Sequence, residues 1–390
     1  MVWPMSLATA SPTQVTRPDS AASDRPEPVT ARQTPPILLW ATAGAALLLF
    51  EVFVWGKWIL GPNFHTVQSG PSVPPLWMRI SLDFWQVGGL VAVAVLFYRF
   101  LVRPWRARRT VTFDGLLLLS FLFVSWQDPL SSYFQNWFTY NSYMVNFGTW
   151  ATDVPGWISY GKPGAVAAEP LLFSIPAYIY YLFFLAVAGS AIMRRVRDRW
   201  PKSGTFGQLG ACFGALALFS VVVEGLVWFP LGVLTYPGGV GPALFSNTYH
   251  KFPLHEAVFI GLIGTAFSLM RLHLNDRGES KSERGLDTLT TGARATVLVR
   301  FLSVFAMTSA AFFFLYNVPT GIIVSHSTSW PTDLQKRSYF TDYICGDGTD
   351  RACPTPYSPL TRPGSVYIGP DGKLVVPSGS TAPVTVPFEK

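Results

Sequence analysis

The 390-residue sequence is poor in charge: Asp, Glu, Lys and Arg make up 13% of it, about half of their share in an average soluble protein. It has no Cys-x-x-Cys pair, no P-loop, no Gly-x-Gly-x-x-Gly fingerprint and no Asp-Asp-x-x-Asp motif. Its five histidines are too few for a membrane di-iron desaturase, and its last apolar segment has no lysine for a retinal Schiff base. These absences argue against a soluble fold, nucleotide binding and magnesium-dependent prenyl transfer.

The sequence has seven apolar segments instead. They cover residues 37–60, 81–102, 113–127, 171–193, 206–229, 254–273 and 295–316. Most reach the length of about 20 residues that crosses a hydrocarbon core, so we expect an all-α, polytopic membrane helical bundle with about seven transmembrane helices. The third segment is short before Trp126-Gln127-Asp128-Pro129. It could continue as a broken helix through Phe138, buried among its neighbours.

Basic residues alternate along the loops. The loops after the second, fourth and sixth segments carry Arg103, Arg106, Arg108, Arg109, Arg194, Arg195, Arg197, Arg199, Lys202, Arg277, Lys281, Arg284 and Arg294. The intervening loops carry only Arg79, Lys162 and Lys251. By the positive-inside rule the N-terminus is cytoplasmic and the C-terminus external, in a multi-pass protein of a bacterial plasma membrane. The net charge of +7 is therefore explained by membrane orientation, and we expect a lipid bilayer and no nucleic acid as a partner.

Two polar tails flank the transmembrane domain, which we place at residues 37–317. Residues 1–36 are rich in Pro, Ser, Thr and Ala and lack an apolar signal-peptide region, so they predict a disordered cytoplasmic tail. Residues 318–390 predict a poorly ordered external tail without a catalytic role, with a hairpin around Pro370-Asp371-Gly372. Cys345 and Cys353 can form a disulfide there if the compartment is oxidising.

Ionisable side chains inside a bilayer are costly, so each is a candidate functional residue. The candidates are Glu51, Asp83, Asp128, Glu169, Glu224, His255 and Glu256. In the topology above, all of them lie in the external half of the membrane or at its surface, which predicts a shared cavity. Asp83 and Glu169 could instead complement helix dipoles, and Asp128 before Pro129 could terminate a helix. His250 and His255 are five residues apart with Pro253 between them, so we expect no metal site.

The loop at residues 126–170 is rich in aromatic residues and amides. Its candidate substrate-binding residues are Trp126, Gln127, Tyr140, Asn141, Asn146, Trp150 and Trp157. Two interpretations fit this composition: an aromatic belt at the membrane interface, or a cap folded over a cavity for an apolar ligand. The amides among the rings favour the cap, because a belt does not need them.

Several short motifs stand out between residues 126 and 173. They are Trp126-Gln127-Asp128-Pro129-Leu130, Phe138-Thr139-Tyr140-Asn141, Asn146-Phe147-Gly148, Trp150, Pro155-Gly156-Trp157 and Glu169-Pro170-Leu171-Leu172-Phe173. At these motifs the chain resembles the AveC-like spirocyclase family, over residues 37–330 and without either tail. The resemblance implies a membrane cyclase and dehydratase of polyketide biosynthesis, which closes a dihydroxy ketone to a spiroketal.

This chemistry suits the candidate residues, because ketal formation needs proton donation, proton removal and stabilisation of an oxocarbenium ion. Asp128 with Glu169 or Glu224 would supply acid and base, and Tyr140 and Asn141 would orient the oxygens. His255 and Glu256 are further acid/base candidates, and Glu51 and Asp83 are further substrate-binding ones. No metal or redox cofactor is required, and the expected partner is a hydrophobic small molecule. A transporter or lipid-binding protein and a non-catalytic scaffold are the alternatives, and the oligomeric state is left open.

Overall fold

The computed structural model describes residues 34–132, 138–156, 167–324, 326, 328–355, 367–369, 371, 373–376 and 378. The chain divides into two units, Met1–Thr34 and Pro35–Lys390, and apart from Thr34 the described residues belong to the second unit. Residues 1–33 lie outside the described residues, so the predicted N-terminal disorder stays a prediction.

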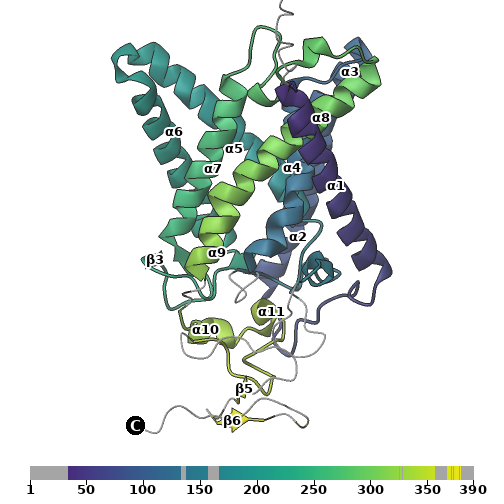
Figure 1. The fold of residues 1–390 in the computed structure, drawn as a ribbon. Helices are drawn as coiled ribbons and strands as arrows, with labels where there is room; N and C mark the ends of the chain where they lie inside the picture. The colour runs from purple at the N-terminus through teal and green to yellow at the C-terminus, as the bar shows by residue number, and fades with distance from the viewer. Residues whose placement is uncertain are drawn as a thin grey trace, which may run out of the picture. The chain divides into compact units, whose positions relative to one another are not determined.

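Helices dominate the described residues, and six helical stretches are long and apolar enough to cross a membrane (Figure 1). They are α1 (Pro36–Leu60), α2 (Leu76–Phe97) with η1 (Tyr98–Val102) and α3 (Arg103–Arg108), α5 (Ser174–Arg199), η4 (Pro201–Ser203) with α6 (Gly204–Ser220) and η5 (Val221–Trp228), α7 (Leu254–Leu272), and α8 (Ala293–Phe312) with η8 (Phe313–Asn317) and α9 (Val318–Val324). The prediction of a polytopic helical bundle is confirmed.

The third predicted segment is the exception in length. Here α4 (Phe113–Val124) has 12 residues and passes into a 3₁₀-helix, η2 (Ser125–Ser132), that contains Pro129. Leu116 and Phe121 are fully buried, because α4 packs against both α5 and α8. Pro129 lacks an N–H for a regular helix, and the polar residues beside it are shielded by protein rather than by lipid. This segment therefore carries Asp128 into the interior of the bundle.

Small residues allow the helices to approach closely, as in other membrane helix pairs. A Cβ atom built on Gly44 of α1 would lie 2.1 Å from the carbonyl oxygen of Leu302 in α8. One built on Gly189 of α5 would lie 2.1 Å from the Ser268 hydroxyl in α7. The backbones of these helix pairs can pack at such distances only because the two positions lack a side chain.

Short elements connect the helices. The short 3₁₀-helices in the connections are η3 (Trp150–Asp153), η6 (Lys281–Glu283) and η7 (Leu286–Thr288). The two-residue strands form three antiparallel pairs, β1 (Thr139–Tyr140) with β2 (Leu234–Thr235), β3 (Ala243–Leu244) with β4 (Phe252–Pro253), and β5 (Tyr367–Ile368) with β6 (Leu374–Val375). The last pair lies where the Pro-Asp-Gly pattern predicts a hairpin.

The chain after α9 differs from the poorly ordered tail that its composition predicts. Residues 328–355, which we call the C-terminal strap, contain α10 (Thr332–Gln335) and α11 (Ser338–Thr341) at the end of the bundle opposite to α3 (Figure 1). Trp330, Tyr339 and Phe340 of the strap are buried in the main core. The Ser142 N–H donates to the carbonyl of Tyr339 over 2.8 Å. The strap is therefore part of the folded domain, because its aromatic side chains are buried in the main core.

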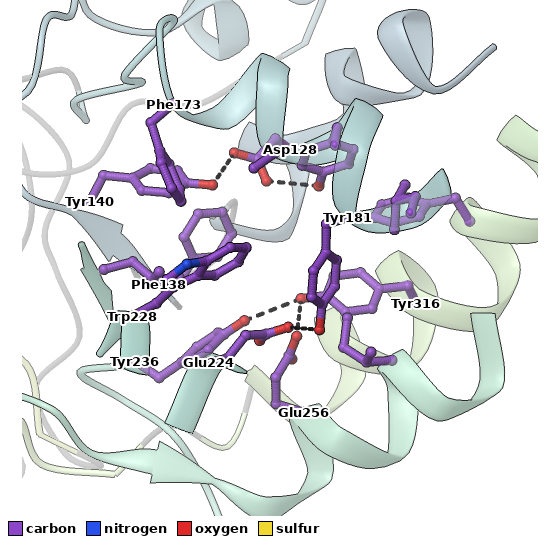
Figure 2. A pocket seen from close by; sticks show the side chains of 16 residues that line it. Asp128, Phe138, Tyr140, Phe173, Tyr181, Glu224, Trp228, Tyr236, Glu256 and Tyr316 are labelled. Carbon is purple, nitrogen blue, oxygen red and sulfur yellow. Dashed lines mark hydrogen bonds between the residues drawn. The ribbon is translucent and has the colours of Figure 1, made fainter. Parts of the chain in front are cut away.

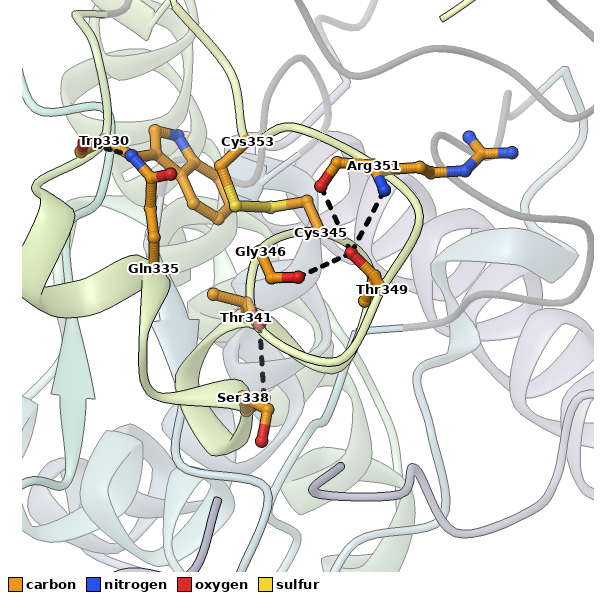
Figure 3. The surroundings of a disulfide bond; sticks show 9 residues. All are labelled: Trp330, Gln335, Ser338, Thr341, Cys345, Gly346, Thr349, Arg351 and Cys353. Atoms are coloured by element: carbon orange, nitrogen blue, oxygen red, sulfur yellow. Dashed lines mark hydrogen bonds between the residues drawn. A yellow bond between two sulfur atoms is a disulfide. The ribbon is translucent and has the colours of Figure 1, made fainter. Parts of the chain in front are cut away.

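A disulfide between Cys345 and Cys353 closes the strap (Figure 3). Within the closed loop, the Thr349 hydroxyl donates to the carbonyl of Gly346 over 2.7 Å and accepts the N–H of Arg351. The Asp347 N–H of the closed loop donates to the carbonyl of Gln335 over 3.0 Å, which connects the loop to α10. The Gln335 amide in turn donates to the carbonyl of Trp330 over 2.8 Å.

Candidate functional site

An interior cavity of about 80 Å³ lies between the helices, near the end of the bundle that carries the strap (Figure 2). It is lined by Asp128, Phe138, Tyr140, Phe173, Ala177, Tyr178, Tyr181, Leu182, Glu224, Trp228, Leu234, Tyr236, Glu256, Ile260, Phe312 and Tyr316. Three carboxyl groups and five phenol hydroxyls therefore face one small space with otherwise apolar walls.

Asp128 forms one end of the cavity together with two tyrosines. The Tyr140 hydroxyl donates to its Oδ2 over 2.8 Å, and the Tyr178 hydroxyl donates to its Oδ1 over 2.7 Å. Tyr140 is held by the pairing of β1 with β2, and Tyr178 projects from α5. Each carboxylate oxygen thus has a phenol partner, which fixes the orientation of the carboxyl group.

Glu169 lies next to Asp128 but behind the lining of the cavity. Burial raises the pKa of the Glu169 carboxyl well above its usual range, and the nearby charge of Asp128 raises it further. Burial also raises the pKa of Asp128, although hydrogen bonds from Glu169, Tyr178 and Tyr140 oppose this rise. Two adjacent carboxyls in this setting cannot both ionise easily, so the pair is suited to holding a proton near neutral pH.

Glu224 and Glu256 form the opposite end of the cavity (Figure 2). The Tyr181 hydroxyl donates to Glu224 over 2.5 Å, and the Tyr316 hydroxyl donates to Glu256 over 2.7 Å. The hydroxyls of Tyr236 and Tyr316 are 3.2 Å apart, which extends this network across the cavity wall. Carboxyl–phenol pairs therefore occupy both ends of the cavity.

Two π-helical segments contribute to this end. Glu224 lies in η5, which ends the helical stretch of α6, and Tyr316 lies in η8, which separates α8 from α9. A π-helical turn inserts an extra residue and rotates the side chains that follow, and such turns occur often at functional sites. The local rotation here brings a carboxyl and a phenol toward the cavity from the ends of long apolar helices.

Aromatic rings line the space between the two polar ends. Trp228 contacts Phe173 edge-on with ring centroids 5.4 Å apart, and Phe138 contacts Tyr236 with centroids 5.9 Å apart. Ring faces have negative potential, so a wall of this kind attracts a cation that forms between the carboxyl groups.

The structure does not bring all predicted acid/base residues into this cavity. Asp128, Glu224 and Glu256 line it, and Glu169 lies beside Asp128. Glu51 is fully buried in α1 outside the lining, and both of its carboxyl oxygens lack a hydrogen-bond partner in the part of the chain that the structure describes. Asp83 is exposed on α2, and His255 packs against the ring of Phe259 outside the cavity. The expectation of one cavity shared by all of them is therefore wrong for Glu51, Asp83 and His255, because hydropathy places a residue along a helix but not around it.

The predicted amide ligands hold backbone segments instead of facing the cavity. Asn141 donates to the carbonyl of Gly232 over 3.0 Å and accepts the N–H of Tyr143. Asn146 donates to the carbonyls of Ser142 and Met144, and Gln127 contacts Asn317 in η8 and the carbonyl of Ser309. None of these three amides lines the cavity, so we no longer expect them to bind substrate.

The predicted tryptophan ligands form a second cluster. Trp126 and Trp150 pack with Val54 and Trp58 of α1, and the Trp150 indole N–H donates to the carbonyl of Trp126 over 2.8 Å. This cluster fixes α1 against the cap, away from the cavity lining. Trp157 lies outside the described residues.

Between residues 138 and 156, several aromatic and amide residues of the loop are buried in protein, namely Phe138, Tyr140, Asn141, Asn146 and Trp150, while Tyr143 and Phe147 are exposed. Phe138 and Tyr140 also line the cavity directly. This burial favours a cap over a lipid-facing belt, and the cap stays a prediction.

The tyrosines were missed by sequence reasoning, with the exception of Tyr140. Tyr178 and Tyr181 are three residues apart on α5 and share a face, a spacing that is visible in the sequence. Tyr236 and Tyr316 carry no comparable signal. Among the described residues, no group of three or more His, Cys, Asp or Glu side chains is placed to hold a metal ion.

Comparisons with known proteins agree with the sequence motifs. The family described as spirocyclase, AveC-like, matches residues 107–340, which is more than half of the chain. The match begins after the first two transmembrane helices and extends into the strap as far as Phe340, further than the motifs indicated. Comparisons with curated proteins and with solved structures give no significant match. The chain belongs to the AveC-like spirocyclase family.

Proposed function

We propose that this protein is a membrane enzyme that closes a hydrophobic, polyketide-like dihydroxy ketone to a spiroketal and can dehydrate the product. The observation that carries the proposal is that hydrogen-bonded carboxyl and phenol groups lie at both ends of one interior cavity, with aromatic rings between them. The family supports the same class of chemistry.

Ketal formation joins a ketone to two hydroxyl groups and releases one water molecule. In the first step a hydroxyl oxygen attacks the carbonyl carbon, a carboxylate at one end removes its proton, and a carboxylic acid at the other end protonates the carbonyl oxygen. The former base, now a carboxylic acid, returns its proton to the hemiketal hydroxyl, which leaves as water and produces an oxocarbenium ion. The second hydroxyl adds to this ion and gives its proton to the carboxylate that the first acid has become, so both groups return to their starting states.

We assign the acid to Asp128 with Glu169 and the base to Glu224 with Glu256. The raised pKa of the Asp128–Glu169 pair supports proton donation near neutral pH. Trp228 and Phe138 line the space where the cation would form. The neighbouring phenols orient the carboxyls and can bind substrate oxygens.

The cavity is small for such a substrate. Its volume of about 80 Å³ is below the several hundred Å³ of a typical small-molecule site. The reacting carbonyl and its two hydroxyls fit this space, while hydrocarbon arms need side chains of the cap or of the helices to move apart. A closed cavity would also keep competing water from the oxocarbenium ion.

The proposal is tested with membranes that contain the protein and a linear dihydroxy ketone whose hydroxyl groups can close six-membered rings on the ketone carbon. We expect spiroketal to form faster than in membranes without the protein, as followed by mass spectrometry and NMR. Equal rates of ketal formation in both membranes, together with saturable binding of the ketone, would overturn the proposal that the protein is an enzyme. This result would favour a lipid-binding protein or a transporter.

We also propose that the strap faces the outside of a bacterial plasma membrane, because the basic loops lie on the other side under the positive-inside rule. An alkaline phosphatase reporter, which is active only outside the cytoplasm, should be active when fused after Lys390. The same reporter fused in the basic loop after Arg199 should be inactive. The opposite pattern would reverse the proposed orientation.

A further inference from the structure

The C-terminal strap places a third acid beside Asp128 and Glu169. The Ala168 N–H donates to the Asp342 carboxyl over 3.2 Å, so Asp342 holds the residue that directly precedes Glu169. Asp342 follows α11 in a left-handed conformation with φ of 50°. This conformation is unfavourable for most residues, and Asp and Asn tolerate it best. An Asp at position 342 therefore tolerates the left-handed backbone and also accepts the Ala168 N–H.

The three acids come from separate parts of the chain and are all nearly fully buried. Among the described residues, one carboxyl oxygen of Glu169 and one of Asp342 have no hydrogen-bond partner. The charged groups that act on Glu169 are Asp128 and Asp342, and the Ser174 hydroxyl is a further neighbour. The hydroxyls of Tyr140 in β1 and Tyr178 in α5 donate to Asp128. Glu169 therefore has two acidic neighbours.

We propose that Asp342 is a positioning residue for Glu169: it accepts the backbone N–H of Ala168 and places a second acidic group near Glu169, which lies beside Asp128. A catalytic role for Asp342 rests on the proposed function. The hydrogen bond between Ala168 and Asp342 does not depend on any substrate. This role gives the strap a part in the acid/base apparatus, where the sequence predicted a tail without a catalytic role.

Two physical effects support this role. The hydrogen bond from Ala168 fixes the backbone that carries Glu169, so the carboxyl remains close to Asp128. Burial raises the pKa of Asp342 as well, and its charge, once formed, raises the pKa of Glu169. An acid at position 342 therefore delays the ionisation of Glu169, whereas a neutral amide of the same shape would not.

The test is an infrared titration of carboxyl C=O bands in the full-length protein in detergent, with isotopically labelled Asp to separate Asp from Glu. The Glu169 band is assigned by its loss in Glu169→Gln. In Asp342→Asn, the amide oxygen can still accept the Ala168 N–H, and we expect the Glu169 band to titrate at lower pH than in the wild type. Asp347→Asn, an exposed change in the same strap, should leave the titration unchanged.

A second measurement remains informative if Asp342→Asn does not fold. In the wild type, Asp342 must ionise at lower pH than Glu169, because only a charged Asp342 can delay the ionisation of Glu169, so the labelled Asp342 band should titrate before the Glu169 band. If Glu169 titrates first, or if its band does not move in a folded Asp342→Asn protein, Asp342 does not act on Glu169 and the inference is overturned. This result would leave the proposed function standing, because that function is judged by the rate of ketal formation in wild-type membranes.

Discussion

Replacement of Asp128 by Asn should lower the rate of ketal formation by about a hundredfold to ten-thousandfold, the usual contribution of a general acid or base. The amide keeps the shape of the side chain, and its single oxygen can still accept one of the two hydroxyls that Tyr140 and Tyr178 donate to Asp128. It cannot exchange a proton with the substrate, however, so the chemical step rather than binding should be affected. We therefore expect kcat to fall strongly while KM changes little.

The matched control is Asp198→Asn. Asp198 is an exposed acid near the end of α5, far along the helix from Tyr178, and its ion pair with Arg197 is also exposed. This change removes the same charge without touching the cavity, and ketal formation should continue at the wild-type rate. If Asp128→Asn retains full activity while it binds the ketone normally, the acid must be another group, and Glu224 and Glu256 become the first candidates to replace.

The helices were largely predictable because a helix that crosses a bilayer needs a certain length and an apolar composition, and both are visible in the hydropathy of the sequence. Even the short third segment was recognisable, since Pro129 and the polar residues around it mark where a regular helix must end. The amides among the aromatic rings were expected to need hydrogen-bond partners, and the structure supplies them for Asn141 and Asn146.

The composition of the site was harder to predict than the fold. Glu51 and Glu224 both stand in apolar runs, yet only Glu224 lines the cavity. This difference depends on the rotation of each helix about its axis and on the π-helical turn at Glu224. The local sequence predicts neither feature. Tyr236 and Tyr316 meet only after distant segments fold together, so no spacing in the sequence connects them.

The strap shows how average composition can mislead. The tail contains many Pro, Ser and Thr residues, which predict disorder. Its first part nevertheless includes Trp330, Tyr339 and Phe340, which become part of the main core. A shorter window would have separated this part from the polar remainder. The Cys345–Cys353 pair lies within the same part, where it closes the chain that carries Asp342.

The largest expected effect on folding is at Gly44. A Cβ atom there would lie 2.1 Å from the Leu302 carbonyl oxygen, which is backbone and cannot move aside as a flexible side chain could. Gly44→Val should therefore force α1 away from α8 and cost about 1–3 kcal/mol or more. The loss should be visible as less monodisperse protein after detergent extraction and as a lower midpoint of thermal unfolding.

Gly56→Val provides the matched control, because it makes the same change in the same helix at a position where, among the described residues, a Cβ atom would meet no atom within 4 Å beyond its own stretch of helix. Its yield and unfolding midpoint should match those of the wild type. Since α1 contributes no residue to the cavity lining, the Gly44→Val protein that does fold should retain the wild-type kcat. Equal stability of the two variants would show that α1 and α8 do not pack at this crossing. A selective loss of kcat in correctly folded Gly44→Val protein would instead show that α1, with the buried carboxyl of Glu51, takes part in the reaction.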